Sequence, residues 1–501
     1  MELSFENKTA AGYRETAHIV KCIQETGEAV VPDTNDDIGK IVSVKTNVLL
    51  KSKDVTTRGV SVSGEAEATV LYITESADAV SYVRLSKKFT ADYDVPGISD
   101  DARTQIRLNL TDAQARIINP RKISLTFSVS GELDVYTHES VISETVLPEN
   151  LAEKGIHVKR ESGEFSLISA AAERSFAVSE QFSFPSSKGT PERLVCERAE
   201  FCVNDTQLIG TKAIARGELK IEVVYLAENV CYPLKTEFST PFSQIIETGE
   251  EQTDRCISTV ELCSQYFDIS DAVNGEKMLN AEIHAVLQVA CYSRKTCSYI
   301  SDAYSNLLPC TCTGESVRQI EQLQIRQTKL VSDEKISISE DFTDILSILP
   351  SVLQPAVGDG KVSGEIVYDI VYRTVQGELS ATRRSVSVEG ECEGRDSRVI
   401  SWRMADVYIR TDGGVIDTHA AVELTYSSEK YTEKSTVVSL ELNEDEPYDF
   451  SSFPTVTIVR AEKNELWEYA RRYHSSVEEI EAVNGKEENY AGKLLLIPKG
   501  I

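Results

Sequence analysis

The sequence has few of the residues on which enzymes and nucleic-acid-binding proteins depend. None of its six histidines lies in a nucleophile elbow or a His-Glu-x-x-His pattern. No glycine-rich phosphate loop precedes a predicted helix. Its 52 Lys and Arg are outnumbered by 80 Asp and Glu, which gives a formal net charge of −28. Because Lys and Arg supply most of the affinity for a phosphate backbone, we expect no nucleic-acid partner. Because the catalytic motifs and the phosphate loop are missing, we also expect no catalytic residue and no cofactor.

Long hydrophobic runs are also missing. No stretch of about 18 apolar residues occurs in the chain, so we expect no membrane insertion. Residues 1–11 contain Glu2, Glu6 and Lys8 with no apolar run behind them, which argues against a secretory signal. We therefore expect the protein to remain in the cytoplasm where it is made.

Cysteine occurs in an odd number, 11, and most of it lies between residues 196 and 312. No Cys-x-x-Cys pair occurs there, and His284 is the one histidine of that region, so the spacing does not favour a zinc site. A full disulfide framework is disfavoured too, and we expect mainly reduced, buried thiols. The alternative left open is that some cysteines cross-link late, under oxidising conditions. We expect no metal.

The composition is that of an ordinary globular protein, with 41% hydrophobic and 26% charged residues. One pattern recurs three times at intervals of about 150 residues. In each copy a Gly-Glu pair is followed by a tyrosine eight residues after the glycine, and apolar residues alternate between them. Such alternation predicts a strand with one buried face, and the interior glycine indicates a bulge or a close backbone approach. The repeated positions are Gly64, Glu65 and Tyr72; Gly217, Glu218 and Tyr225; and Gly364, Glu365 and Tyr372.

A second predicted strand closes each copy, and turn residues precede it at Asn119-Pro120, Asn274-Gly275 and Asp412-Gly413-Gly414. We therefore expect a mainly β protein whose three repeated domains are antiparallel sandwiches or partly closed barrels. The expected limits are 1–150, 151–312 for a Cys-rich second domain, and 313–442 for a shorter third domain. Residues 443–454 are acidic and predict a linker.

The period of the apolar residues changes to about 3.6 in residues 455–501. Asn464 is the expected cap of a helix that carries Leu466, Trp467, Ala470 and Tyr473 on one face. Ser476 and Glu479 form a capping-box pattern for a second helix, and Asn484-Gly485 stops it. With an apolar segment on either side, the predicted order is β-α-α-β. Its expected core residues are Ala470, Tyr473, Val477, Ile480, Leu495 and Ile497.

This C-terminal run resembles a LysM module, which combines a Leu-Trp helix start, a helix ending in Asn-Gly and a Leu-x-Ile-Pro strand. The matching residues here are Leu466-Trp467, Asn484-Gly485 and Leu495 to Pro498. Where the family has Gly-Asp-Thr in a loop that lines the glycan groove, this chain has Lys463-Asn464-Glu465. We therefore expect the module to bind a protein through this loop and the start of the first helix, at Lys463, Asn464, Glu465, Leu466 and Trp467. For Trp467 itself, core packing is the alternative to a binding role.

The repeated Gly-Glu and Tyr pattern resembles SPOCS domains, and several such domains followed by one LysM module resemble the SipL family of coat morphogenetic proteins. That resemblance implies a non-enzymatic scaffold made in the mother cell and recruited to the forespore surface. Its implied partners are coat morphogenetic proteins, among them a basement-layer coat ATPase bound by the LysM module. The alternative is an envelope protein that binds peptidoglycan through the LysM module, against which the missing export signal and the altered loop argue.

Overall fold

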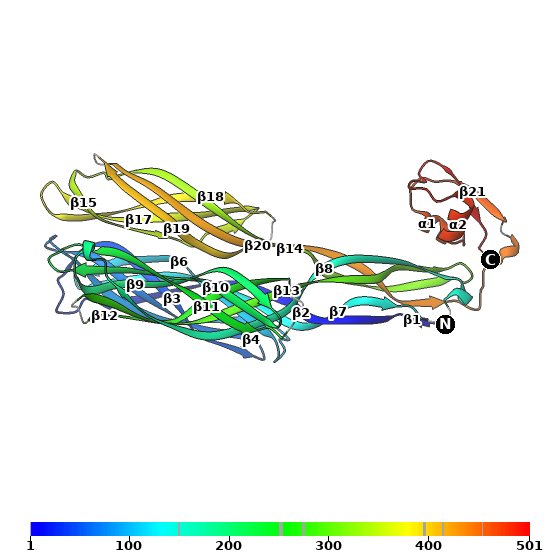
Figure 1. Cartoon of the computed structure of the whole chain (residues 1–501), viewed down its shortest axis with the longest axis horizontal. Coiled ribbons are helices and arrows are strands. Elements are labelled where there is room, and N and C mark those ends of the chain that lie inside the picture. Colours follow the sequence, from blue (N-terminus) through cyan, green and yellow to red (C-terminus); the bar gives the residue numbers. More distant parts are fainter. Residues whose placement is uncertain are drawn as a thin grey trace.

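The computed structural model describes residues 2–148, 151–249, 254–272, 276–393, 397–412, 415–452 and 454–500. It is mainly β, with several antiparallel sheets and two short helices near the C-terminus, which confirms the predicted fold class. The chain forms an elongated β body that narrows into a stalk, and the small C-terminal module lies at the stalk's far end, beside the N-terminus (Figure 1). No helix of the described part has the length and apolar character needed to cross a bilayer. The predicted turn residues Asn274-Gly275 and Gly413-Gly414 lie outside the described residues.

The first repeat consists of two facing sheets. One sheet contains the long strands β2 and β7 together with β6, and the other has the order β3-β4-β5. Alternate apolar residues of both sheets pack into one core, in which Val62 on β4 and Phe127 on β7 are almost completely buried. This is a two-layer sandwich. Its strands are β2 (Glu6–Val30), β3 (Ile38–Thr56), β4 (Gly59–Thr74), β5 (Val80–Asp94), β6 (Arg103–Asn119) and β7 (Lys122–Val146), and the short strand β1 (Glu2–Ser4) precedes them.

The second and third repeats have the same plan. Their first and last long strands pair over their whole length, β8 with β13 and β14 with β20, while β9-β10-β11 and β15-β17-β18 form the second sheets. The strands of the second repeat are β8 (Ile156–Ser183), β9 (Pro191–Ile209), β10 (Lys212–Ala227), β11 (Leu234–Glu247), β12 (Arg255–Asp271) and β13 (Lys277–Ser305). Those of the third are β14 (Cys310–Ser337), β15 (Phe342–Val352), β16 (Ala356–Gly358), β17 (Lys361–Thr374), β18 (Leu379–Glu391), β19 (Arg398–Asp412) and β20 (Val415–Leu442).

The repeated tyrosines occupy equivalent places, near the end of the central strand of each second sheet. Tyr72 on β4 and Tyr225 on β10 donate hydrogen bonds to the backbone oxygens of Asp36 (3.0 Å) and Lys188 (3.3 Å). In the third repeat, Tyr372 on β17 donates to a carboxylate oxygen of Glu340 at 2.5 Å. Each buried phenol thus finds a polar partner in the loop that enters its second sheet, which explains why tyrosine recurs there.

The repeated glycines lie against aromatic rings. A Cβ atom on Gly64 would lie 2.3 Å from the ring of Phe89, and one on Gly364 would lie 2.4 Å from Trp402. On Gly217 it would lie 1.9 Å from the backbone oxygen of Cys202 and 2.9 Å from Phe242. Close approach therefore requires glycine at all three positions. The neighbouring glutamates Glu218 and Glu365 are exposed, whereas Glu65 forms an ion pair with Lys51 at 3.2 Å.

The residue before each repeated tyrosine points to the opposite face of the strand and joins the repeats together. Leu71, Val224 and Val371 are nearly fully buried in one apolar cluster to which all three repeats contribute. Alternation on a strand means that the tyrosine fills its own sandwich while its neighbour fills this shared core. The three repeats therefore form one body instead of separate beads.

The stalk is built from the extended ends of the long strands. The flanking strands β6, β12 and β19 pair with β7, β13 and β20 only as far as Tyr136, Tyr292 and Ser427. Beyond these residues, the long pairs β2–β7, β8–β13 and β14–β20 continue without a flanking strand. The three extended pairs pack on one another through apolar clusters that include Phe165 and Ile300. The sequence predicted a second strand that closes each repeat but not this shared stalk.

Two expected domain limits differ from the structure. The limit after Cys312 falls inside β14, which starts at Cys310, so the break between the second and third repeats lies in residues 306–309. At the N-terminus, β1 pairs with residues 439–441 of β20 and so belongs to the third repeat's part of the stalk. The second difference arises because the stalk brings together strands that are distant in the sequence.

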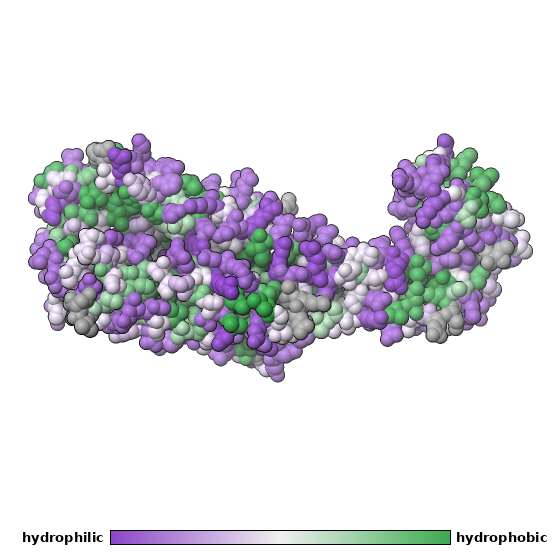
Figure 2. All heavy atoms as spheres, in the orientation of Figure 1, coloured by the Kyte–Doolittle hydropathy of each residue, from purple (hydrophilic) through white to green (hydrophobic). Residues whose placement is uncertain are grey.

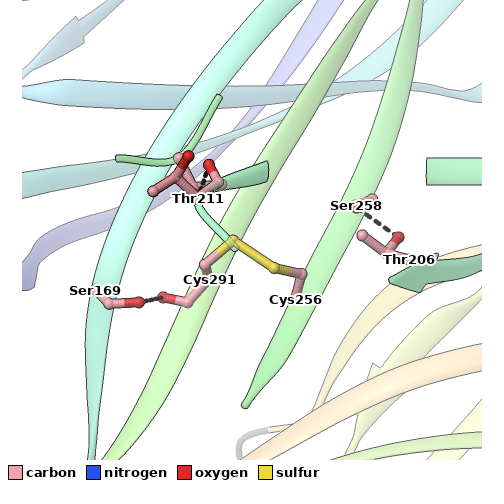
Figure 3. The surroundings of a disulfide bond; sticks show 7 residues. Ser169, Thr206, Thr211, Cys256, Ser258 and Cys291 are labelled. Atoms are coloured by element: carbon pink, nitrogen blue, oxygen red, sulfur yellow. Dashed lines mark hydrogen bonds between the residues drawn. A yellow bond between two sulfur atoms is a disulfide. The ribbon is translucent and has the colours of Figure 1, made fainter. Parts of the chain in front are cut away.

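A cross-strand disulfide joins Cys256 on β12 to Cys291 on β13 (Figure 3). The sequence did not predict this pair, because the two residues meet only through the register of the two strands. The other cysteines of the chain are free. Cys196, Cys202, Cys297 and Cys392 are buried as expected, whereas Cys22 is exposed and the remaining four are partly buried. Burial, together with the nearby charge of Glu197, raises the pKa of Cys196 to about 12, so this thiol stays protonated at neutral pH.

Candidate interaction site at the C-terminal module

The C-terminal module contains β21 (Val456–Arg460), α1 (Leu466–Arg472), α2 (Val477–Asn484) and β22 (Leu494–Pro498). The two strands pair antiparallel, and both helices contribute to one small core. The Ser476 and Glu479 capping box predicted for α2 is confirmed. Of the expected core residues, Ala470, Ile480, Leu495 and Ile497 are buried, while Tyr473 and Val477 are partly buried against the same cluster. Tyr469 and Tyr490 also belong to this core but were not expected.

The predicted binding loop is exposed at Lys463, Asn464 and Glu465. Asn464 is not the cap of α1, which begins after Glu465 without a side-chain cap. Its amide nitrogen donates to the backbone oxygen of Glu488 (2.9 Å), and its amide oxygen accepts from the backbone nitrogen of Tyr490 (2.7 Å). Two bonds across the module replace one local cap, and they hold the first loop beside the loop between α2 and β22.

Leu466 and Trp467 lie differently from the expectation that they contact a partner. Leu466 is buried in the module. Trp467 packs on Tyr304 of β13, with ring centroids 4.8 Å apart, and its indole nitrogen donates to Asp302 at 2.8 Å. Trp467 is also partly buried against the core cluster of the module, as the core alternative predicts, and the contact with Tyr304 extends this packing to the chain's own stalk.

Several polar contacts fix the module to the stalk. Arg471 forms an ion pair with Asp302 at 2.9 Å, so this carboxylate accepts from two residues of α1. The Tyr304 hydroxyl donates to the backbone oxygen of Ser475 at 2.8 Å. Tyr304 is almost completely buried and sits between the stalk and the module. The interface therefore combines an aromatic contact with charge-assisted hydrogen bonds.

Histidines lie on both sides of this interface. His157 on β8 stacks on Tyr304, with ring centroids 5.1 Å apart, and its buried Nε2 has no hydrogen-bond partner among the described residues. Burial lowers the pKa of His157, although the nearby carboxylates of Glu478 and Glu479 act in the opposite direction. Burial also lowers the pKa of His474, whose ring contacts Tyr448 at a centroid distance of 4.0 Å. Both imidazoles are therefore favoured in their neutral form.

The expected linker, 443–454, is bound to the stalk along its described residues. Glu444 forms an ion pair with Lys154 at 2.9 Å. The backbone nitrogens of Asn443 and Tyr448 donate to Pro309 and Leu307 (2.9 and 3.1 Å). These contacts hold the segment against the stalk, whereas its acidic, polar sequence predicted a linker.

A second charged cluster lies where the first and third repeats meet. Glu15, His18 and Asp134 hold potential metal-ligand atoms within 4.8 Å of one another, the one such group among the described residues. Arg398 of β19 binds Glu15 through two bonds (2.7 and 2.8 Å) and lies 3.5 Å from Asp134. Arg107 lies 3.4 Å from Asp134 on another side.

The guanidinium groups supply the positive charge that these carboxylates need. Burial raises the pKa of Asp134, but the hydrogen bond with His18 and the charge of Arg107 outweigh it, and the net pKa lies below the ordinary value. The cluster is thus an ion-pair network between repeats. Sequence reasoning missed it because Glu15 and Arg398 are 383 residues apart.

The comparisons with known proteins identify one segment. Residues 37–118 match the family described as SipL, SPOCS domain. The matched segment spans β3 to β6 and so includes the Gly64 and Tyr72 pair of the first repeat. No curated protein and no solved structure matches the chain.

Proposed function

We propose that this protein is a non-enzymatic scaffold in the assembly of the endospore coat. The SPOCS match of residues 37–118 supports a role in spore coat morphogenesis. The repeated Gly and Tyr contacts of the second and third repeats support the same domain type for all three, with the break between the second and third in residues 306–309.

The observation that carries the proposal is the placement of the C-terminal module. It is fixed at the end of a stalk by Tyr304 and Asp302, away from the three sandwiches. Such an arrangement separates two binding regions by a rigid spacer, which suits a protein that links layers. The β-α-α-β order, Leu466-Trp467 and Asn484-Gly485 support a LysM-type module.

Within this proposal, the module binds a basement-layer coat ATPase at the forespore surface, and the chain acts in the mother cell cytoplasm. Residues 455–501 hold seven Lys and Arg and eight Glu, so their net charge is −1 within a chain of −28. The module is therefore the least repulsive surface for an acidic protein. Lys463 and Glu465 are exposed beside the module's second loop and are its proposed rim contacts.

The test measures binding of the purified full-length chain to purified coat ATPase, to a muropeptide and to a chitooligosaccharide. We expect saturable binding of the ATPase and none of either glycan. Replacing Lys463 and Glu465 together by Ala should weaken ATPase binding by about 1 to 3 kcal/mol. Lys486→Ala, an exposed change elsewhere in the module, is the matched control. Glycan binding without ATPase binding would favour the envelope alternative.

A further inference from the structure

The outer face of the module's two-stranded sheet is apolar. Val456 and Ile458 on β21 are 44% and 64% exposed, and Leu494 and Leu496 on β22 are 69% and 37% exposed. Ile458 lies directly opposite Leu496, so the side chains adjoin instead of being scattered. Figure 2 shows hydrophobic surface on the side of the module that faces away from the β body. A contiguous apolar patch of this kind marks an interaction site.

The two edges of this sheet differ. At the outer edge of β22, the Asn484 side chain donates to the backbone oxygen of Leu496 (2.6 Å) and accepts from its nitrogen (2.8 Å). The amide thus stands where a neighbouring strand would be, and it closes that edge.

The outer edge of β21 is open. Thr455 and Ala461 bond across to Lys499 and Lys493 (3.0 and 2.9 Å), which fixes the alternation of the backbone groups. The N–H and C=O groups of Val456, Ile458 and Arg460 therefore point away from β22. No described residue forms a hydrogen bond with them. Unpaired strand groups beside an apolar face form a template for a further strand.

Charge is present at one end of this edge. The Arg460 side chain is exposed and forms no ion pair with any described residue, although its Nε donates to the backbone oxygen of Gly492 at 3.3 Å. A carboxylate of an incoming strand beside Arg460 would complement it. A second copy of the chain is a poorer occupant, because each copy carries a net charge of −28.

We propose that β21 receives an extended segment of a partner protein as a third strand of the module's sheet. The segment carries apolar residues at alternate positions, which cover Val456, Ile458 and their neighbours on β22, and an acidic residue next to Arg460. This inference rests on the proposed function, since it names the surface through which the module binds its protein partner.

Three variants of the full chain separate the parts of the proposal. Ile458→Pro removes one outward N–H group and blocks the edge but leaves the β21–β22 hydrogen bonds possible. Ile458→Asp changes only an exposed side chain, and Arg460→Glu reverses the charge. Val483→Asp is the control, since Val483 is an exposed apolar residue of α2 outside the sheet.

The probe is a fluorescent ten-residue peptide that alternates Val and Thr and ends in two Glu, compared with a scrambled peptide and with a Lys-ended peptide. We expect the first to bind the wild-type chain at least about tenfold more tightly than either control peptide. Each of the three β21 variants should lose at least about tenfold in affinity, and Val483→Asp should not. Hydrogen exchange should slow at Val456, Ile458 and Arg460.

Equal binding of all three peptides, slowed exchange on the sandwiches instead of β21, or peptide-independent dimerisation through β21 would overturn the proposal. The ATPase experiment is read separately. If the ATPase does not bind the wild-type chain while the peptide binds β21, the proposed function fails and the open edge stands. If the ATPase binds the wild-type chain and the Ile458→Asp variant equally well, and the peptide does not bind, the inference about β21 fails and the proposed function stands.

Discussion

Arg398 in the third repeat binds Glu15 in the first through two hydrogen bonds, of 2.7 and 2.8 Å. The same guanidinium lies 3.5 Å from Asp134, which is almost completely buried. One residue therefore compensates charge on two strands of another repeat. The repeats are joined by specific pairs such as this one in addition to their shared apolar core.

Replacing Arg398 by Ala should destabilise the chain by about 3 to 5 kcal/mol, because it leaves the half-buried Glu15 without its ion-pair partner and removes one of the positive charges around Asp134, which keeps His18 and Arg107. Urea unfolding followed by circular dichroism measures this. Lys329→Ala is the control, since its ion pair with Asp406 is exposed and should contribute at most about 1 kcal/mol. Equal effects of the two changes would contradict the role given to Arg398.

Gly64→Ala should destabilise the first repeat by about 1 to 3 kcal/mol, because the new methyl group meets the ring of Phe89. Gly163→Ala, with no atom within 4 Å of the added Cβ, is the control and should be nearly neutral. Adding Phe89→Leu should recover part of the loss. Thermal unfolding of Gly64→Ala, Phe89→Leu, the double variant and the Gly163→Ala control measures the coupling, and additive effects of the first two changes would exclude the ring as the cause.

Asp302→Ala should loosen the C-terminal module without unfolding the sandwiches, because it removes the partner of both Trp467 and Arg471. In a Trp402→Phe background, Trp467 fluorescence should shift to longer wavelength as the indole meets water. Small-angle scattering should show a broader range of lengths. Glu441→Ala, an exposed change on the same stalk, should alter neither signal.

Acidification should weaken the contact between module and stalk. The pKa of His157 is lowered in the folded chain, whereas an exposed histidine has a pKa of about 6.5. As the pH falls below about 6.5, the undocked or unfolded state therefore binds a proton before the docked state does. Docking is therefore fully stable above that pH and loses stability as the pH falls toward the folded pKa. Trp467 fluorescence between pH 8 and 5 follows this change, and His157→Phe should reduce its pH dependence. An unchanged profile in that variant would exclude His157.

Local patterns in the sequence predicted the local structure well. The alternation around Tyr72 gives a strand, and the Ser476-Glu479 spacing gives a capping box, because both depend on neighbouring residues. Asn464 shows the limit of such reasoning, since its amide bonds to a loop about 25 residues away that a helix rule does not consider.

Contacts between distant segments could not be predicted. Nothing near Trp467 in the sequence indicates Tyr304 or Asp302, and nothing near Cys256 indicates Cys291 as its partner. The shared core around Leu71 had a visible signal, because the residue before each repeated tyrosine is apolar on the face expected to be exposed. Apolar residues at these positions predict that this face of each strand is buried, but they do not predict that the faces of the three repeats pack on one another.

The most direct test of the scaffold account is hydrogen exchange of the full-length chain with and without purified coat ATPase, at concentrations that saturate binding. The account predicts slowed exchange in the segment from Val456 to Glu465, with the three sandwiches unchanged. Binding that slows exchange only in the sandwiches, or no binding while a muropeptide slows exchange in the loop at Asn464, would contradict it.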